Sequence, residues 1–307
     1  MGDFHTPVLL NESIDYLITD KSGTYFDGTL GFGGHSSKIL ETINKDGLLI
    51  STDVDLDAFN YSKSILGKEQ NMKLYNFNFS KIKIIAKLES IKAFNGIFAD
   101  LGISSHQIDD PASGFTFRKE AELDLRMDKT IKLTAAKLIN TFAEDEISNI
   151  IFKYGEERNS RKIARRIIEK RKAGSIKTTT DLAGIISDIV PERFLNKTLS
   201  RVFQALRIYI NKELNVLKTF LDDSVDLLAE GGRIVVLTYH SLEDRIVKEK
   251  FKYEALTCVC PKDYPVCQCD KVQRLKIITR KPVYPSPEEI SINRRARSAK
   301  LRAAVRI

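Results

Sequence analysis

Three aspartates are the residues of this sequence best placed to do chemistry. Asp27, Asp53 and Asp100 each end a short run with the apolar character of a buried strand. Helical patterns separate these runs, so we expect parallel strands joined by crossovers. Parallel strands end at one edge of a sheet, which brings the three carboxylates to one crevice. Three acids at such a crevice favour an adenosine-type ligand.

A glycine-rich turn follows the first of these acids. Gly31, Gly33 and Gly34 lie within seven positions of Asp27, and glycine permits positive φ and a close approach of the backbone to a ligand. A helical pattern begins directly afterwards, so we predict a strand, a turn and a helix, with Ser36 or Ser37 as the N-cap. The alternative is an ordinary strand-to-helix connection, in which one glycine is common but three are not.

The order of acid and glycines separates two classes of adenosine ligand. A dinucleotide-binding turn places the pyrophosphate on the helix N-terminus, where the acid Asp27 would repel it. The same acid suits S-adenosylmethionine, which carries a cationic amine and a sulfonium and has no phosphate. We therefore expect this methyl donor rather than NAD.

Two further residues are candidates for contacts with an adenosine. An acid at the end of the second strand typically accepts hydrogen bonds from ribose hydroxyls, although Asp53 is alternatively the N-cap of a helix near Asp57. Residues 73–79 alternate like a third strand that ends at Phe79. Phe79 is either a core residue or a surface on which a base lies flat.

The composition is that of a soluble globular protein with a moderate excess of positive charge. Of the 307 residues, 42% are hydrophobic and 29% are charged, and the formal net charge is +8. No apolar run approaches the length of a membrane span, and the first residues lack the pattern of a signal peptide. We expect a cytoplasmic protein without a membrane partner. The charge is compatible with a polyanionic partner but does not require one, and the oligomeric state is undetermined.

Helices interrupt the alternation of strands and helices after Asp100. Strand character returns only at 233–238, which indicates an inserted helical domain at about 108–205. The segments 1–107 and 206–307 then form one discontinuous domain. Helices inside the insert are predicted at 135–142, 144–152, 160–172 and 180–190.

The helix predicted at 160–172 has two faces. One is apolar and contains Ile163 and Ile167. The other is basic and consists of Arg161, Lys162, Arg165 and Arg166. This basic face is either a solvated surface or a clamp for nucleic-acid phosphates, which adds affinity and salt dependence without reading sequence.

A second polar group follows the fifth predicted strand, 234–239. That strand carries His240–Arg245 to the same edge of the sheet. The His, Glu, Asp and Arg side chains of this segment suit a pocket for a base. The alternative is a helix start with Ser241 as the N-cap in a capping box.

The second half of the chain supplies the remaining elements of the sheet. A helix at 216–228 is predicted to stop at Gly231-Gly232. Residues 275–279 are a strand candidate, and 299–307 alternate like a strand with a basic face. The short basic loop 293–297 contains no acid and is either exposed or a contact for RNA phosphates.

All four cysteines of the chain lie in one cluster. Cys258, Cys260, Cys267 and Cys269 form two Cys-x-Cys pairs. The clustering favours tetrahedral zinc, although the usual spacing is Cys-x-x-Cys, and disulfides are not expected in a reducing cytoplasm. Structural zinc and free thiols both remain open, and we assign no metal ligand from the sequence.

Ordered motifs across the chain resemble one known family. The resemblance runs from Phe4 to the C-terminus and is carried by His5-x-Pro7-Val8-Leu9-Leu10, Asp27-Gly28-Thr29, Gly33-Gly34-His35-Ser36, Asp100 to Asp110, Gly114-Phe115-Thr116-Phe117, Leu123 to Asp128, Tyr154 to Arg158, Phe203 to Ile208 and His240 to Arg245. These motifs are similar to those of the RsmH family, also called MraW. Its members are S-adenosylmethionine-dependent methyltransferases that modify N4 of a cytidine in the decoding region of bacterial 16S rRNA.

The resemblance implies a fold, a cofactor and a partner. The fold is α/β, of the class I (Rossmann-like) methyltransferase type, with an inserted helical domain for substrate recognition and a closing antiparallel strand pair. The cofactor is S-adenosyl-L-methionine, and the partner is 16S rRNA within the small ribosomal subunit. The donor site implied by the resemblance is lined by Gly33, Gly34, His35, Asp53, Phe79, Asp100 and Gln107.

Asp100 is the candidate catalytic residue. Methyl transfer is an in-line displacement, so alignment of donor and acceptor is the main task, and a carboxylate at the cytosine amine would favour a pyramidal nitrogen. Many amino-methyltransferases follow this acid with Pro-Pro and an aromatic residue, whereas this chain has Leu101-Gly102-Ile103. Asp100 therefore either activates the amine or only holds the donor. A non-catalytic RNA-binding protein and a nucleotide-dependent dehydrogenase are the competing functions.

Overall fold

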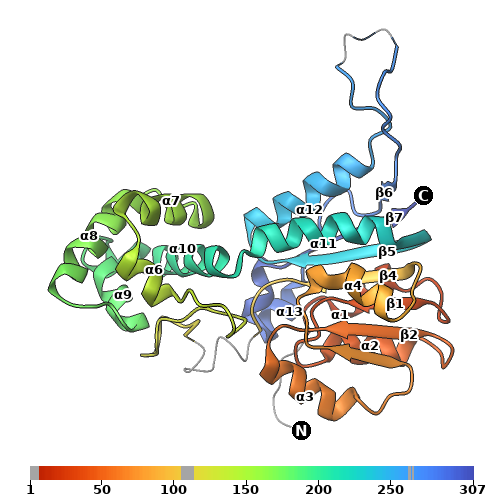
Figure 1. Ribbon diagram of the computed structural model, residues 1–307, viewed down its shortest axis with the longest axis horizontal. Coiled ribbons are helices and arrows are strands. Elements are labelled where there is room, and N and C mark those ends of the chain that lie inside the picture. Colours follow the sequence, from red (N-terminus) through yellow and green to blue (C-terminus); the bar gives the residue numbers. More distant parts are fainter. Residues whose placement is uncertain (1–6, 105–113, 262–263, 265) are drawn as a thin grey trace. The chain divides into compact units, whose positions relative to one another are not determined.

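The computed structural model describes residues 7–104, 114–261, 264 and 266–307, and the chain forms two compact units (Figure 1). The first unit combines Met1–Gly102 with Leu214–Ile307, and the second is Ile103–Glu213. The second unit is longer at both ends than the insert expected at 108–205. A continuous helix, α10 (Glu192–Asn211), runs through residue 205.

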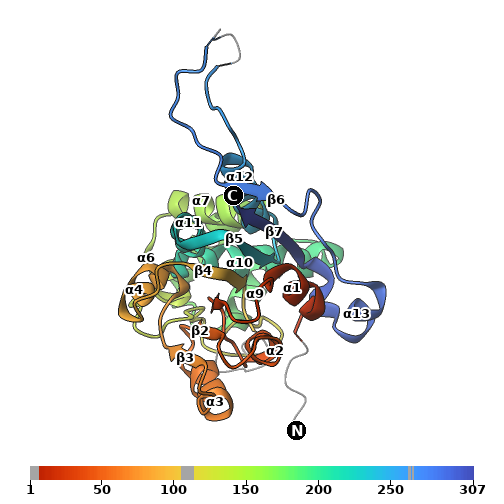
Figure 2. The same cartoon turned by 90° about the vertical axis from the view of Figure 1, so that its right-hand side faces the viewer.

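The first unit is built on a seven-stranded sheet in the order β3-β2-β1-β4-β5-β7-β6 (Figure 2). The strands are β1 (Thr24–Asp27), β2 (Leu48–Thr52), β3 (Met72–Tyr75), β4 (Phe94–Asp100), β5 (Leu228–Thr238), β6 (Leu275–Ile277) and β7 (Lys300–Arg306). Neighbours from β3 to β5 are parallel, and β7 is antiparallel to both β5 and β6. The predicted class I, Rossmann-like sheet with its closing antiparallel pair is confirmed.

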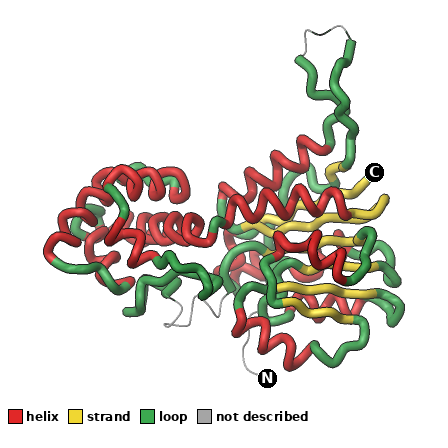
Figure 3. Tube along the Cα trace, in the orientation of Figure 1, coloured by secondary structure: helices red, strands yellow, loops and turns green. Residues whose placement is uncertain are grey.

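Helices pack on both faces of this sheet (Figure 3). One layer contains α1 (Leu10–Leu17), α2 (Gly34–Thr42) and α3 (Leu56–Leu66), and the other contains α4 (Ile82–Leu88), α11 (Glu213–Leu227) and α12 (Ser241–Glu254). Successive strand residues point to opposite faces, so Tyr25 packs in the first layer and Phe26 in the second. Both side chains are fully buried, and each such burial contributes about 1.5–3 kcal/mol.

The third strand is shorter than the sequence suggested. It ends at Tyr75 and not at Phe79. Asn78 ends the extended segment, because its side chain accepts the N–H of Ser80 at 3.0 Å and starts a 3₁₀ turn, η1 (Phe79–Lys81). Phe79 therefore opens a turn that follows the strand.

The helix before β5 also ends earlier than predicted. It stops at Leu227, and β5 begins at the next residue. Gly231 and Gly232 lie inside β5, where the pairing with β4 shifts register and Gly231 has φ of 75°. The two glycines therefore form a strand irregularity and not a helix stop.

The expected basic face of β7 is not a free surface. Arg302 is only 7% exposed, and its Nε donates to Asp244 Oδ1 of α12 at 2.6 Å. Lys300 Nζ reaches the other carboxylate oxygen at 3.3 Å. The alternation of β7 is real, but Asp244 neutralises two of its cations within the fold.

The described part of the second unit is helical and has its own apolar core. Besides α10 it contains α6 (Ala135–Thr141), α7 (Glu144–Gly155), α8 (Ser160–Ala173) and α9 (Thr179–Ser187). These four agree with the predicted helices apart from their ends. Val202 and Leu206 of α10 are fully buried in this core together with Ile163 and Ile167 of α8.

Motif residues of this unit hold its irregular segment in place. Arg126 donates to both carboxylate oxygens of Asp124, from Nε at 2.6 Å and from Nη2 at 3.0 Å. Asn211 at the end of α10 accepts the N–H of Met127 and donates to the carbonyl of Leu125, both at 2.8 Å. The motif from Leu123 to Asp128 is thus structural, because its polar groups are bonded within the unit.

Candidate active site

The turn after β1 is built around Asp27, which is fully buried. Its Oδ1 accepts the N–H of Thr29 at 2.9 Å and the hydroxyl of Thr29 at 3.3 Å, and its Oδ2 accepts the hydroxyl of Ser36 at 2.6 Å. Burial raises the pKa of Asp27, and these hydrogen bonds oppose the rise. The expectation that Asp27 faces a ligand amine is therefore wrong, since both oxygens are enclosed and bonded within the protein.

Glycines are required at the start of α2. Gly33, its N-cap, has φ of 83°, and a Cβ there would lie 2.9 Å from Leu66 Cδ1. A Cβ on Gly34 would lie 2.3 Å from Pro7 Cγ. A larger residue at either position would displace the turn, so these glycines allow the chain to pass close to its neighbours.

The predicted serine cap of α2 is wrong. Ser36 turns its hydroxyl to Asp27, and the hydroxyl of Ser37 donates to the carbonyl of Gly33 at 2.7 Å. No side chain of the described residues makes the N-cap hydrogen bond of this helix. The N-cap is instead Gly33, whose left-handed conformation favours glycine. The two serines stabilise the loop through the hydrogen bonds given above.

Asp53 lies one residue beyond β2 and faces the same turn. Its Oδ2 accepts the N–H of Gly31 at 2.7 Å, and its Oδ1 accepts the N–H of Asp55 at 2.8 Å. Burial raises its pKa to about 6, although both hydrogen bonds oppose the rise. The N-cap of α3 is Asp55, so the alternative role considered for Asp53 belongs to its neighbour.

Phe79 lies against the first residue of the turn. A Cβ on Gly28 would be only 2.8 Å from Phe79 Cβ, so the aromatic side chain packs directly on the main chain. Its ring meets Phe220 of α11 edge-on, with centroids 5.0 Å apart. Phe79 is half-buried, so it is anchored in the core and still partly exposed beside the turn.

Asp100, at the end of β4, is bonded to residues that follow both neighbouring strands, β1 and β5. Its N–H donates to Thr29 Oγ1 at 2.7 Å, and its Oδ1 accepts the hydroxyl of Tyr239 at 2.8 Å. Burial raises the pKa of Asp100 to about 7; the hydrogen bond from Tyr239 opposes this rise and the negative charge of Asp27 adds to it. Burial and the adjacent Asp100 also raise the pKa of Tyr239, so its hydroxyl stays protonated.

His35 is buried between the turn and Asp100. Its Nε2 lies 3.1 Å from the carbonyl oxygen of Val8, which fixes Nε2 as the donor because a carbonyl only accepts. Nδ1 then faces Asp100 Oδ2 across 3.8 Å, and the ring packs on Phe98 with centroids 4.6 Å apart. His35 therefore packs at the edge of the site and exposes little of its side chain to a ligand.

The turn connects all three strand-end acids. Thr29 bonds to Asp27 and Asp100, and Gly31 bonds to Asp53. The convergence expected from the strand ends is thus present in the first unit. Gln107, the remaining residue of the proposed donor site, lies outside the described residues.

No lysine or arginine among the described residues neutralises Asp53 or Asp100. There, the hydrogen bonds and ion pairs of Asp53 and Asp100 involve backbone N–H groups, Tyr239 and His35, but no lysine or arginine. Their raised pKa values follow from this arrangement, because burial penalises a charge that nothing nearby neutralises. Such a site suits a positively charged ligand without phosphate.

The segment after β5 forms the start of α12. The N-cap is His240, not Ser241, and its Nδ1 accepts the N–H of Glu243 at 3.5 Å. Glu243 is 3% exposed and accepts the N–H of Tyr239 at 3.1 Å. Asp244 is the partner of β7 described above, so part of this motif is structural.

Sequence reasoning missed two residues of this edge, Tyr239 and Thr29. Tyr239 was predicted only as the last residue of a strand. A tyrosine at the carboxyl end of a strand can, however, donate a hydrogen bond to an acid at the end of the neighbouring strand. Thr29 bonds two of the three acids. A hydroxyl inside a turn between two strand-end acids was the signal available.

Comparisons with known proteins decide the family. A model of the MraW methylase family matches residues 3–307. The chain belongs to this family. It is therefore a methyltransferase, and the predicted cofactor, S-adenosylmethionine, is confirmed at the level of the family.

Relatives in this family match along their whole length. The ribosomal RNA small subunit methyltransferase H of Caldicellulosiruptor bescii is 47% identical over 304 residues, with 99% of this chain and 99% of the relative covered. The protein of the same name from Fusobacterium nucleatum is 46% identical over 307 residues, with coverage of 100% and 98%.

Solved structures resemble the chain more distantly. A putative rRNA methylase from Clostridium thermocellum and a putative methyltransferase from Streptococcus mutans in complex with SAH each give a TM-score of 0.46 at 11% identity, covering 99% of this chain and 100% of theirs. The fold assignment accordingly depends on the strand order described above. No helix in the described residues is long and apolar enough to cross a membrane.

Proposed function

We propose that this chain transfers a methyl group from S-adenosylmethionine to N4 of a cytidine in the decoding region of 16S rRNA within the small ribosomal subunit. Family membership and the names of its relatives support the class of substrate. The observation that carries the donor assignment is a pair of partly buried acids, Asp53 and Asp100, whose pKa values are raised by burial and which no described lysine or arginine neutralises. We place the reaction in the cytoplasm, where this substrate is made.

The proposed donor contacts other than Gln107 have a structural basis. Asp53 keeps acceptor capacity on both oxygens, which suits the two hydroxyls of a ribose. Phe79 offers a partly exposed aromatic surface beside the turn. Gly33 and Gly34 hold the tight main-chain path there, and His35 Nδ1 lies 3.8 Å from Asp100 Oδ2. Gln107 is retained in this set from the resemblance.

Asp100 is the proposed catalytic residue. S-adenosylmethionine, when bound, supplies an electrophilic methyl group, and the cytosine amine must lose a proton in the course of the reaction. A carboxylate with a pKa of about 7 is close to the working pH of the cell, which suits a group that accepts such a proton. Tyr239 holds Oδ1 in place and leaves Oδ2 on the side of His35.

Exposed cations in both units support an RNA partner. Arg161 and Lys162 of α8 are exposed, and the described residues include no ion-pair partner for either, whereas Arg166 of the same helix is bonded to Glu169 and Asp188. We therefore propose phosphate contacts only for Arg161 and Lys162, in the first turn of α8. We assign substrate recognition to the second unit as a whole.

A similar pair lies on η3 (Arg294–Ser298) of the first unit. Arg294 and Arg297 are exposed and have no ion-pair partner among the described residues. Replacing either arginine should weaken binding about equally for all RNA sequences and make that binding less sensitive to salt.

One experiment tests the whole proposal. Purified protein is incubated with methyl-labelled S-adenosylmethionine and with small subunits that lack the modification. We expect label at one cytidine, on the exocyclic amine, and much less of it with the Asp53→Ala variant at a limiting donor concentration. Label on another base, or binding of RNA and donor without transfer, would contradict it. Tight binding of NAD in place of the donor would favour the alternative hypothesis of a nucleotide-dependent dehydrogenase.

A further inference from the structure

The four cysteines lie together on the segment of the first unit that connects α12 to β6 (Figure 1). Cys258 Sγ lies 3.4 Å from Cys267 Sγ and 3.7 Å from Cys269 Sγ. Cys267 Sγ lies 3.6 Å from Cys269 Sγ and 3.9 Å from Cys260 Sγ. All four sulfurs fall within 4.8 Å of one another.

These distances have the size of a metal cage. Tetrahedral zinc with Zn–S bonds of about 2.3 Å requires sulfurs roughly 3.8 Å apart. A disulfide would require about 2.05 Å. The four separations given above, between 3.4 and 3.9 Å, match the edges of such a tetrahedron, and none of these pairs is bonded.

Main-chain N–H groups point at three of these sulfurs. Val259 N–H donates to Cys269 Sγ, Cys260 N–H to Cys258 Sγ and Gln268 N–H to Cys260 Sγ, each at 3.3 Å. Four thiolates around a dication carry a net negative charge, and amide dipoles directed at sulfur reduce its cost. The local backbone is thus arranged for ionised sulfur on both sides of the segment.

The described residues of this segment form no apolar core that would order it. Among the described residues between 256 and 274, none is buried. Val259 and Val266 beside the cysteines are 46% and 69% exposed. Ordering a chain costs about 1–2 kcal/mol per residue in backbone entropy, and burial offsets none of it here.

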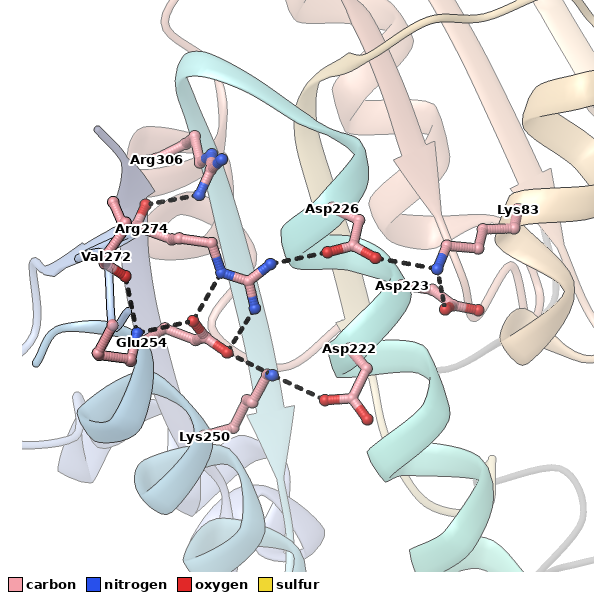
Figure 4. Close-up of polar contacts among 10 residues, drawn as sticks. Lys83, Asp222, Asp223, Asp226, Lys250, Glu254, Val272, Arg274 and Arg306 are labelled. Atoms are coloured by element: carbon pink, nitrogen blue, oxygen red, sulfur yellow. Dashed lines mark hydrogen bonds and ion pairs between the residues drawn. The ribbon is translucent and has the colours of Figure 1, made fainter. Parts of the chain in front are cut away.

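The base of the segment is held by a different device. Glu254, at the end of α12, accepts hydrogen bonds from Arg274 at 2.7 and 2.8 Å and from Lys271 at 3.4 Å (Figure 4). This clamp fixes the two ends of the segment where they join α12 and β6. The part beyond it, which carries the cysteines, requires a second fastening.

We propose that Cys258, Cys260, Cys267 and Cys269 bind one Zn²⁺ ion as a structural site. Four protein ligands leave no open position, so the ion takes no part in methyl transfer. Its binding free energy orders the tip of the segment, as in small metal-dependent folds. Of the two alternatives left open by the sequence, zinc and free thiols, the proposal takes zinc.

The test measures metal in the full-length protein. Wild-type protein, a variant with Cys258→Ser and Cys267→Ser, and a Gln268→Ser control are purified under reducing conditions with zinc and passed over a chelating resin. Gln268 lies between two of the cysteines and contributes only its main chain, so the control keeps all four ligands. We expect about one zinc ion per chain in wild type and control and complete loss in the double variant.

A second measurement does not depend on the folding of any variant. Wild-type protein stripped of metal is titrated with Co²⁺, and we expect sulfur-to-metal charge-transfer bands together with the visible bands of tetrahedral cobalt. Equal zinc in wild type and double variant, octahedral cobalt spectra, or disulfides in the intact mass of the unreduced protein would each overturn the proposal.

Discussion

Two carboxylates of the first unit, the buried Glu254 and the partly buried Asp100, differ in whether a cation neutralises them. Glu254 is bonded to Lys250, Lys271 and Arg274 (Figure 4). Burial alone would raise its pKa, but hydrogen bonds from Arg274 and Lys250 lower it to about 2. Asp100 has no such cation among the described residues, and burial raises its pKa to about 7.

The presence or absence of a neutralising lysine or arginine distinguishes an acid that stabilises the fold from an acid that is available to a ligand. The cations around Glu254 extend into a network, in which Arg274 also bonds to Asp226 and Lys83 joins that acid to α4. An acid neutralised in this way stabilises the packing of helices and strands. A partly buried acid that no lysine or arginine neutralises costs stability, and a ligand that supplies a positive charge would offset that cost.

The largest expected effect comes from breaking the neutralised acid. Glu254→Gln leaves cations facing a neutral amide, and loss of one member of a buried ion group costs about 3–5 kcal/mol. Denaturant unfolding measures this loss. Glu249→Gln, an exposed acid on the same helix, should be close to neutral. A Glu254 variant with wild-type stability would remove one half of the comparison.

The next effect concerns the acids without a cation. Asp53→Ala removes acceptors for ribose hydroxyls, and hydrogen bonds to a charged group contribute about 1.5–3 kcal/mol, or roughly 10- to 150-fold in donor affinity. Calorimetry with S-adenosylmethionine measures it. Asp57→Ala, an exposed acid of α3, is the control, and equal losses in both variants would contradict a direct contact.

The pH dependence sharpens the contrast. With pKa values of about 6 and about 7, Asp53 and Asp100 are largely protonated at pH 5 and ionised at pH 8. A cationic donor prefers the ionised form, so its affinity should rise with pH, at most about tenfold per unit for each proton released. Calorimetry in buffers of different ionisation enthalpy detects those protons. A flat profile would mean that neither acid meets the donor charge.

The same raised pKa values fix the sign of the stability effect. Raised carboxyl pKa values stabilise the fold below the unfolded values near 4, and this stabilisation is lost as pH rises through 6 to 7. Glu254 behaves oppositely, because its lowered pKa makes its contribution disappear only as pH falls towards about 2. Added donor should therefore stabilise the protein most at the higher pH.

The smallest effect belongs to Tyr239, a positioning residue. Tyr239→Phe removes the hydrogen bond that opposes the raised pKa of Asp100. One such bond contributes about 0.5–1.5 kcal/mol, so the acidic limb of the rate profile should move up by roughly 0.5–1 pH unit. A drop in rate without that shift would assign Tyr239 a merely structural role.

The sequence predicted the elements whose causes are local. Apolar runs and helical spacing located β1, β2, β4 and the helices α6 to α9, and the acids at the strand ends follow from those strands. The roles within the site were less accessible. Asp27 looked like a ligand contact because nothing in the sequence shows that Thr29 and Ser36 enclose it.

Other differences came from tertiary contacts. Phe79 continued an alternating pattern, but the side chain of Asn78 ends the strand first. The arginines of β7 suggested a free face, yet Asp244, far away in sequence, neutralises Arg302. Periodicity reports which side a residue takes, whereas its partner depends on the chain returning from elsewhere.

The discontinuity of the first unit has a consequence for how the protein folds. β4 pairs with β5, yet the whole second unit lies between them in the chain. During translation, β1 to β4 emerge early and must wait with an unpaired edge while the helices of the second unit form from local contacts. Contact order makes closure of the catalytic sheet the slow step, and that waiting edge is where aggregation or chaperone binding should act.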